Sequence, residues 1–355
     1  TPPPLTTASP LSYPTPATPS VAQAPPSSSA ALTPPALRFQ GVYVLQGDES
    51  SARARLSGLY PLSPRVQAGA TLDLTTGEAF ADSPDEGLSI NELYIAAALE
   101  NVPNLRFVLG QLDLTSYFDR NSFAKDGASQ FFNPVFQTNP ALAATAISSR
   151  PGALVNWSIT DTLEARAAVF SSARSIGDFA LDAFAGEVGL RLGNAIIRGT
   201  YVSARDGGSN SGFGEIFSID RGDGQRGPFD DDREESYGIN AEYFIPEINM
   251  GIFGRYGRYE NRDLDEGGDT YSGGVSFLDV FSEGDRLGLA YGRGLSNQRL
   301  RREDDRNPDV LELFYDFRLL PNLRLGLTLQ QLNEFSESIA GLRIRTDFDL
   351  MGGGN

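Results

Sequence analysis

Apolar and polar side chains alternate at every second position through most of this chain. In "LRLGLTLQ", residues 323–330, the leucines oppose Arg324, Thr328 and Gln330. In "SARARLSGLY", residues 51–60, alanine and leucine oppose arginine and serine. Successive side chains of a strand point to opposite faces of a sheet, so this pattern predicts strands with one apolar and one polar face. The sequence is therefore typical of an all-β fold.

The same rule predicts about sixteen strands along the chain. The expected spans are 37–46, 51–61, 66–75, 88–98, 104–112, 153–160, 163–171, 181–193, 195–205, 236–245, 248–259, 270–280, 286–293, 310–319, 323–331 and 339–348.

The connections between these strands alternate in length. Tight turns follow the even strands, at 62–64, 101–103, 160–162, 193–194, 246–247, 282–284 and 321–322. Longer, charged loops follow the odd strands, notably at 76–87, 113–152, 206–235, 260–269 and 294–309. Short turns on one rim, long loops on the other and an apolar outer band are typical of an antiparallel transmembrane β-barrel with a polar lumen.

The alternative is a soluble β-sandwich or solenoid, in which apolar faces meet in a core and arginines face water. The difference between the two rims favours the barrel. So does a set of aromatic residues near strand ends on the apolar face, which suits the two membrane interfaces. These residues are Tyr60, Trp157, Tyr201, Tyr243, Tyr256, Tyr271, Tyr315 and Phe348.

The composition excludes several classes of function. A formal net charge of -17 argues against a nucleic-acid partner, because phosphate binding needs a basic surface. The chain has no cysteine and no histidine, which excludes thiol and His-assisted nucleophiles and His-ligated metals. We therefore expect no enzyme activity and no cofactor. The acidic stretches 229–235 and 262–269 do not complete an EF-hand, so we also expect no metal site.

The segment 113–152 interrupts the rhythm of strands. Loops of this length are uncommon in compact domains and are usually functional or disordered. A barrel of about sixteen strands would leave an aqueous channel, which a loop folded inside would narrow. The sequence therefore predicts that this long third outer loop folds inward and constricts a pore.

The run "GQLDLTSYFDRNSFAKDGASQFFNPVFQTNP", residues 110–140, resembles the carbohydrate-selective porin (OprB-like) family, especially its cyanobacterial members. The resemblance implies a sixteen-stranded channel in the outer membrane of a Gram-negative-type bacterium, passive diffusion and no catalysis. It also implies a homotrimer among outer-membrane lipids and lipopolysaccharide. Cyanobacterial relatives usually carry an S-layer-homology domain before the barrel, and none is visible here.

Three segments are expected. Residues 1–36 are a Pro/Ser/Thr-rich tract without apolar periodicity, which predicts a disordered linker. Residues 37–350 form the barrel. Residues 351–355 extend past it, whereas barrel chains of this kind commonly end on an aromatic residue. No charged-then-apolar leader stands at Thr1, so we expect any secretion signal to be removed or to lie outside this sequence.

Charged residues of the long loop and the polar strand face are the candidate constriction and solute-binding site. We expect the loop acids to face lumenal arginines across the gap and create a transverse field. The candidates are Asp113, Asp119, Arg120, Lys125 and Asp126 on the loop, and Arg53, Arg55, Arg106 and Arg166 on nearby strands.

Two hypotheses of function remain. The first is a porin for passive diffusion of ions and small hydrophilic solutes, with sugars among the solutes considered. The alternative is a structural protein that links the outer membrane to the cell wall through residues 1–36, with conduction incidental.

Overall fold

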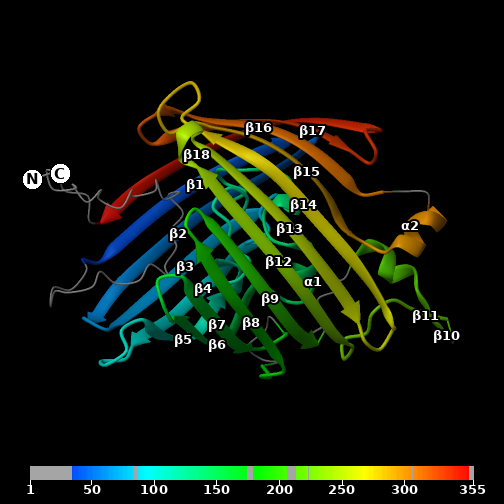
Figure 1. The fold of residues 1–355 in the computed structure, drawn as a ribbon, viewed down its shortest axis with the longest axis horizontal. Helices are drawn as coiled ribbons and strands as arrows, with labels where there is room; N and C mark the ends of the chain where they lie inside the picture. Colours follow the sequence, from blue (N-terminus) through cyan, green and yellow to red (C-terminus); the bar gives the residue numbers. More distant parts are fainter. Residues whose placement is uncertain are drawn as a thin grey trace, which may run out of the picture.

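Sixteen of the described strands form one closed antiparallel barrel in which the first strand, β1, pairs with the last, β18 (Figure 1). The computed structural model describes residues 34–83, 86–173, 179–205, 213–222, 224–304 and 307–351. The barrel strands are β1 (Ala36–Gln46), β2 (Glu49–Ser63), β3 (Val66–Thr76), β4 (Gly87–Ala98), β5 (Leu105–Asp113), β6 (Ser149–Ser158), β7 (Leu163–Phe170), β8 (Ala183–Leu192), β9 (Ala195–Arg205), β12 (Arg233–Ile245), β13 (Met250–Asn261), β14 (Glu266–Leu278), β15 (Arg286–Ser296), β16 (Asp309–Leu320), β17 (Leu323–Leu332) and β18 (Glu337–Met351).

Each strand expected from the alternation corresponds to one strand of the barrel. Neighbours along the chain pair in simple antiparallel order, so no strand crosses over another. The predicted sixteen-stranded all-β barrel is confirmed. The sandwich and solenoid alternatives are wrong, because the sheet closes on itself and has no free edge.

The alternation places apolar side chains outside the barrel and polar ones inside. On β17, Leu327 and Leu329 are 50% and 60% exposed, whereas Thr328 and Gln330 are 3% and 2% exposed. Five of the expected interface aromatics, Tyr60, Trp157, Tyr243, Tyr256 and Phe348, are also exposed. An exterior covered by large apolar side chains around a fully hydrogen-bonded sheet suits a lipid bilayer.

The two rims differ as the sequence predicts, with one exception. The short-turn rim carries 64–65, 99–104, 159–162, 193–194, 246–249, 279–285 and 321–322 between consecutive strands. The long-loop rim carries 77–86, 114–148, 171–182, 206–232 and 297–308. The chain enters β1 and leaves β18 at the short-turn rim, where Leu37 pairs with Met351.

The exception is the connection expected at 260–269, where the prediction of a long loop is wrong. Strands β13 and β14 continue their pairing to Asn261 and Glu266, and only 262–265 connects them. Strand ends that rise above a bilayer meet water on their outer side and lose the apolar alternation. The rule used to find strands therefore ends them too early here.

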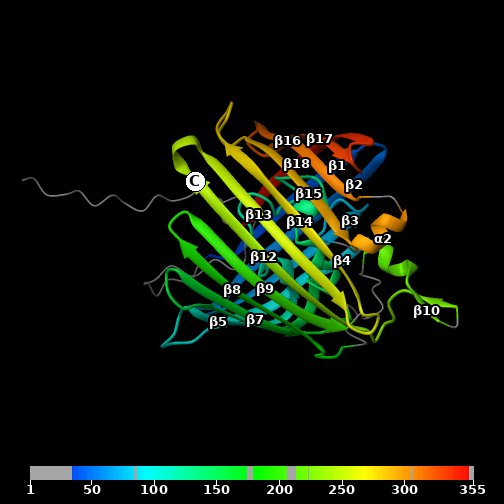
Figure 2. The same ribbon diagram turned by 45° about the vertical axis from the view of Figure 1, so that its right-hand side comes forward.

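Small elements cover part of the long-loop rim (Figure 2). They are the 3-10 helix η4 (Gly214–Ser218), the hairpin β10 (Asp220–Gly222) and β11 (Gln225–Arg226), and helix α2 (Gln298–Asp304). The 3-10 helix η5 (Pro246–Ile248) lies in a turn of the opposite rim. Across the described part of the chain, no helix is long and apolar enough to cross a membrane.

The expected linker 1–36 and extension 351–355 fall almost entirely outside the described residues. Ala36 already belongs to β1, and Met351 ends β18.

Candidate functional site: the loop inside the barrel

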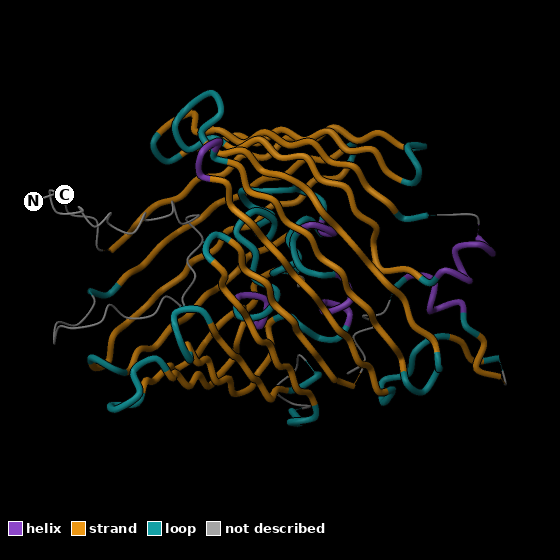
Figure 3. The backbone as a smooth tube through the Cα atoms, viewed as in Figure 1, coloured by secondary structure: helices purple, strands orange, loops and turns teal. Residues whose placement is uncertain are grey.

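Residues 114–148 lie inside the barrel as a compact loop of short helical turns (Figure 3). The turns are η1 (Leu114–Ser116), η2 (Pro134–Phe136) and α1 (Pro140–Ala144). The loop leaves β5 at Asp113, whose carboxylate accepts hydrogen bonds from the Thr115 amide at 3.0 Å and the Ser116 hydroxyl at 2.7 Å. This cap starts η1 and turns the chain away from the wall. Asp113 pairs with Ser149, so both ends of the loop meet in adjacent strands.

An aromatic cluster fixes one part of the loop to the far wall. Phe131 is 1% exposed, and its ring centroid lies 4.9 Å from Phe136 of the loop. Phe253 of β13 lies 5.6 Å and Phe314 of β16 lies 4.6 Å from the same ring. Full burial of a phenylalanine contributes roughly 1.5–3 kcal/mol, so the cluster is a main source of docking energy.

Glycines on the inner face make room for this docking. A Cβ atom at Gly251 of β13 would lie 2.1 Å from the Phe123 ring, and one at Gly257 would lie 2.2 Å from Asn139 Oδ1. A Cβ atom at Gly238 of β12 would lie 2.9 Å from Leu142 of the loop, and one at Gly288 of β15 would lie 2.2 Å from Phe314. Glycine inside a strand often marks a close approach of other atoms, and here those atoms belong mainly to the loop.

Asp119 is the buried polar anchor of the loop. Its carboxylate accepts hydrogen bonds from the Asn139 amide at 2.8 Å and from Asn240 Nδ2 of β12 at 2.8 Å. It also forms an ion pair with Arg255 of β13 at 3.2 Å, and the two side chains are 1% and 2% exposed. Arg255 donates further hydrogen bonds to the carbonyls of Phe136 and Ala124.

Other wall side chains bind the loop backbone from several directions. Arg343 of β18 donates to the carbonyls of Gly127 and Gln130, both at 2.9 Å. Glu312 of β16 accepts from the amides of Phe132 at 2.7 Å and Asn133 at 2.9 Å. From the near side, Arg166 donates to the Tyr117 carbonyl, Arg198 to the Arg120 carbonyl, and Glu242 accepts from the Ser122 amide. The loop is therefore bound across the full width of the barrel.

Of the strand arginines expected at the site, Arg53 and Arg55 contact the short outer loop 77–86. They form ion pairs with Asp82 at 2.7 and 2.8 Å, and Arg55 also binds Asp73 of β3 at 2.7 Å. Burial opposes the charge of Asp82, but Arg53 and Arg55 outweigh it and hold the pKa of this carboxyl well below its usual range.

The other two strand arginines lie on the wall beside the start of the loop. Arg166 of β7 forms ion pairs with Glu187 and Glu164. Arg106 of β5 is 9% exposed and lies near Tyr117 of the loop and Tyr94 of β4.

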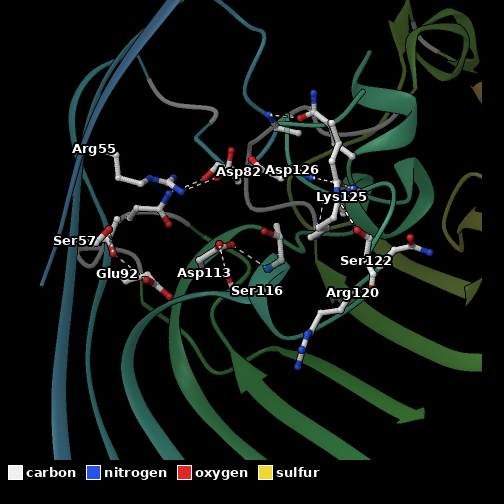
Figure 4. A pocket seen from close by; sticks show the side chains of 18 of the residues that line it. Arg55, Ser57, Asp82, Glu92, Asp113, Ser116, Arg120, Ser122, Lys125 and Asp126 are labelled. Atoms are coloured by element: carbon white, nitrogen blue, oxygen red, sulfur yellow. Dashed lines mark hydrogen bonds and ion pairs between the residues drawn. The ribbon is translucent and has the colours of Figure 1, made fainter. Parts of the chain in front are cut away.

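A chamber of about 210 Å³ lies between the loop, the outer loop 77–86 and the inner face of β2, β3 and β4, and we call it the long-loop chamber (Figure 4). The charged side chains lining it are balanced in sign. They are Arg55, Arg120, Lys125 and Arg198 together with Asp82, Glu92, Asp113 and Asp126.

A second chamber of about 250 Å³ lies between the loop and the short-turn rim, and we call it the short-turn chamber. Arg120, Ser122, Gln130 and Arg198 line both chambers, so the two spaces meet at these residues. The charged groups lining the short-turn chamber are Arg120, Arg191, Arg198, Arg286 and Glu242.

The remaining loop candidates divide between anchoring and lining roles. Asp126 lines the long-loop chamber and lies 3.7 Å from Arg345 of β18. Burial would raise the pKa of Asp126, but Arg345 and hydrogen bonds from Ser129 and Ala128 outweigh it and lower the pKa. Asp119 lines neither chamber and serves as an anchor, whereas Asp113 caps η1. Among the described residues, Asp119 and Asp126 are the loop acids that form an ion pair with a wall arginine.

The cationic loop residues both line open space. Lys125 donates to the Thr138 hydroxyl at 2.9 Å, and burial lowers its pKa. The guanidinium of Arg120 makes no hydrogen bond or ion pair with any residue that the structure describes. Burial, together with the charges of Arg166 and Arg198, lowers the pKa of Arg120 to about 10.

Sequence reasoning missed Arg255, Glu312 and Glu187 and did not connect Arg343 with the loop. The expectation favoured strands close to the loop in sequence, whereas the loop crosses the lumen to β13, β16 and β18. The glycines on the inner face of the wall strands could have indicated where the loop docks, since a glycine inside a strand often marks the close approach of another segment.

A closed sixteen-stranded barrel with a long loop inside its lumen defines the fold of the outer-membrane porins. No protein-family profile matches the sequence, and no curated protein matches it. Among solved structures the chain is similar to OprB of Pseudomonas putida in its high-pH structure. The TM-score is 0.63 at 13% identity, covering 89% of this chain and 94% of OprB.

Two further structures show the same fold. OmpT, an outer membrane protein of Vibrio cholerae, matches with a TM-score of 0.57 at 11% identity, covering 88% of this chain and 97% of OmpT. Salmonella typhi OmpF in complex with daunomycin matches with a TM-score of 0.54 at 13% identity, covering 89% and 97%. The resemblance seen in residues 110–140 is therefore confirmed at the level of the fold.

Proposed function

We propose that this protein is an outer-membrane porin for passive diffusion of ions and small hydrophilic solutes, constricted by residues 114–148. The observation that carries the proposal is that two charged chambers share Arg120 in their lining, beside a loop bound across the lumen. A charged, water-accessible path lowers the cost of moving an ion through the membrane. The apolar exterior supports outer-membrane lipids and lipopolysaccharide as the partners of the outer wall.

The residues lining the long-loop chamber suit the passage of ions and small polar solutes better than the specific binding of sugars. Among the described residues that line the long-loop chamber, none is aromatic. Sugar recognition commonly uses aromatic faces beside polar groups, so carbohydrates are expected to pass only as one class of small solute.

A loop replacement tests the proposal directly. Because Asp113 pairs with Ser149, a short Gly-Ser turn can replace 116–146 without displacing β5 or β6. Single-channel conductance in planar bilayers should rise, and liposome-swelling assays should show entry of larger sugars. The matched control removes the β10–β11 hairpin, whose described residues line neither chamber, and should leave both readings unchanged. Unchanged conductance after loop replacement would contradict the constriction.

Assembly and surroundings are part of the same proposal. We infer a homotrimer. Vibrio cholerae OmpT, whose trimer form matches this chain with a TM-score of 0.57, supports this assembly. Native mass measurement in detergent tests it. The resemblance in residues 110–140 supports a Gram-negative-type outer membrane of cyanobacterial kind.

A contact with the cell wall is the remaining alternative role. The tract 1–33 precedes a strand that begins at the short-turn rim, which faces the periplasm in barrels of this architecture. Sedimentation with purified cell wall, with and without residues 1–33, tests this contact. Loss of co-sedimentation on truncation would support it, and equal sedimentation would contradict it.

A further inference from the structure

The short-turn chamber differs from the long-loop chamber in the balance of its charges. Arg120, Arg191, Arg198 and Arg286 line it, and Glu242 is the single carboxylate among the lining residues that the structure describes. Glu242 is already engaged, because its carboxylate accepts from Arg198 at 3.1 Å and from the Ser122 amide at 2.5 Å. The chamber therefore holds an excess of positive charge from three arginines.

These three arginines have unused hydrogen-bond donors. The Nη1 atom of Arg286 is buried and has no hydrogen-bond partner among the described residues. Within the same described residues, the guanidiniums of Arg120 and Arg191 enter no ion pair. Burying a donor without a partner is unfavourable, so a ligand that accepts from it is favoured.

The direction of Arg120 supports the same conclusion. Figure 4 shows its side chain extending away from Asp126 and Lys125 of the long-loop chamber. Arg120 lines both chambers, so its charge reaches the short-turn side of the loop. Burial and two neighbouring arginines lower its pKa to about 10, and it remains charged at neutral pH.

The chemistry of the donors selects the ligand. A guanidinium presents planar pairs of N–H groups that match two oxygens of an oxyanion, which a spherical halide cannot use in the same way. Rings of arginine and lysine are also the usual basis of anion-conducting pores. A volume of about 250 Å³ exceeds the ~30 Å³ share of one water several-fold, so a hydrated oxyanion fits.

We propose that the short-turn chamber is a binding station for small inorganic oxyanions such as phosphate or sulfate, held by Arg120, Arg191 and Arg286. The station rests on the proposed porin function and names a solute class for it. Its place beyond the loop makes it the last site before the short-turn rim. An ion that has passed the constriction is held there briefly and then released.

The test measures the block of chloride current by inorganic phosphate in planar bilayers at low salt and neutral pH. Phosphate should reduce the wild-type KCl current in a saturating way, compared with added KCl of equal ionic strength. The concentration for half block should rise about tenfold in R286Q and several-fold in R191Q, since one good charge-assisted contact is worth roughly 1.5 kcal/mol or more.

The control variant is R65Q. Arg65 pairs with Glu100 at 3.1 Å on the exposed side of the short-turn rim, so R65Q removes the same charge without touching the chamber. Its half-blocking concentration should equal that of the wild type. Because Arg191 is exposed, R191Q tests the station even if R286Q does not insert.

The outcomes separate this inference from the porin function. Channels that conduct KCl but show no saturating phosphate block would overturn the station alone. An equal half-blocking concentration in wild type, R286Q and R191Q would also overturn it. Failure of the wild type to form any channel would instead contradict the proposed function.

Discussion

Removing the charge of Asp119 should release the loop from the lumen while the barrel stays folded. D119N is the sharpest change, because Asp119 has a left-handed backbone with φ of 52°, which asparagine also adopts readily. The amide therefore changes the ion pair and not the turn. It leaves Arg255 buried without its carboxylate partner, and the single amide oxygen cannot accept from Asn139, Asn240 and Arg255 as the two carboxylate oxygens do.

The magnitude follows from the burial of this pair. Breaking a buried ion pair by removing one partner costs about 3–5 kcal/mol. Arg255 keeps its hydrogen bonds to the carbonyls of Phe136 and Ala124, so the lower end of that range applies. A cost of about 3 kcal/mol corresponds to roughly a 150-fold larger population of the undocked loop.

The chain offers a specific assay, because Lys125 is its only lysine. A lysine-specific protease can therefore cut only after Lys125, inside the loop. In the docked loop the amides of Lys125 and Asp126 both donate to Gln130 Oε1, so cleavage requires opening. When opening and closing are fast, the cleavage rate follows the open population, and D119N should be cut roughly 150-fold faster.

The matched control is D161N on an exposed turn, which removes the same charge far from the loop and should be cut at the wild-type rate. The melting temperature of the barrel should be the same in all three proteins. Equal cleavage of D119N and wild type would refute the reasoning that this ion pair holds the loop. A large loss of barrel stability in D119N would show that loop and wall fold as one unit.

Three further predictions concern the wall and the chambers. L327R places an arginine on the lipid face and should lower the free energy of unfolding in lipid by about 2–4 kcal/mol. The control S57R places the arginine in the long-loop chamber and should fold normally. Equal folding yields would contradict the orientation of the barrel. Because the pKa values of Arg120 and Lys125 are lowered, both side chains lose positive charge at a lower pH than usual. The anion-to-cation permeability ratio, measured by reversal potential, should therefore fall as pH rises from 8 through about 10. The double variant R120Q/K125Q should lack this pH dependence, and an unchanged dependence would assign it to other groups. G251A adds a Cβ atom 2.1 Å from Phe123 and should loosen the loop, which would be seen as faster cleavage at Lys125. The control G254A lies on the open outer face of the same strand and should be cleaved at the wild-type rate. Equal rates in the two variants would show that the wall accommodates the methyl group.

The strands of the barrel wall could be predicted from sequence because each of them has one face towards lipid and the other towards the lumen. Thr328 and Gln330 point into the barrel and Leu327 and Leu329 point out, and a period of two is enough to read this. The rule fails where the environment changes, as at 260–261 and 266–269, where paired strands rise into water and both faces become polar.

The interior of the barrel could not be predicted in the same way. The segment of the loop was recognisable by its length and its lack of alternation, but its partners depend on a path through three-dimensional space. Asp119 binds Arg255, 136 positions further along the chain, and Gly127 binds Arg343 across 216 positions. No local pattern carries such pairings, so Arg53 and Arg55, which are nearer in sequence, were expected in their place.

The pairing of β1 with β18 has a consequence for how the molecule is made. Arg38 and Asp349 form a hydrogen bond across 311 positions, so the sheet has two bare edges until nearly the whole chain exists. Folding such a distant contact is slow, because the closure entropy must be overcome before any pairing energy is gained. Until that moment the exposed edges can pair with other chains. Insertion should therefore be complete only after synthesis ends, and a truncation that removes β18 should yield aggregates and no smaller barrel.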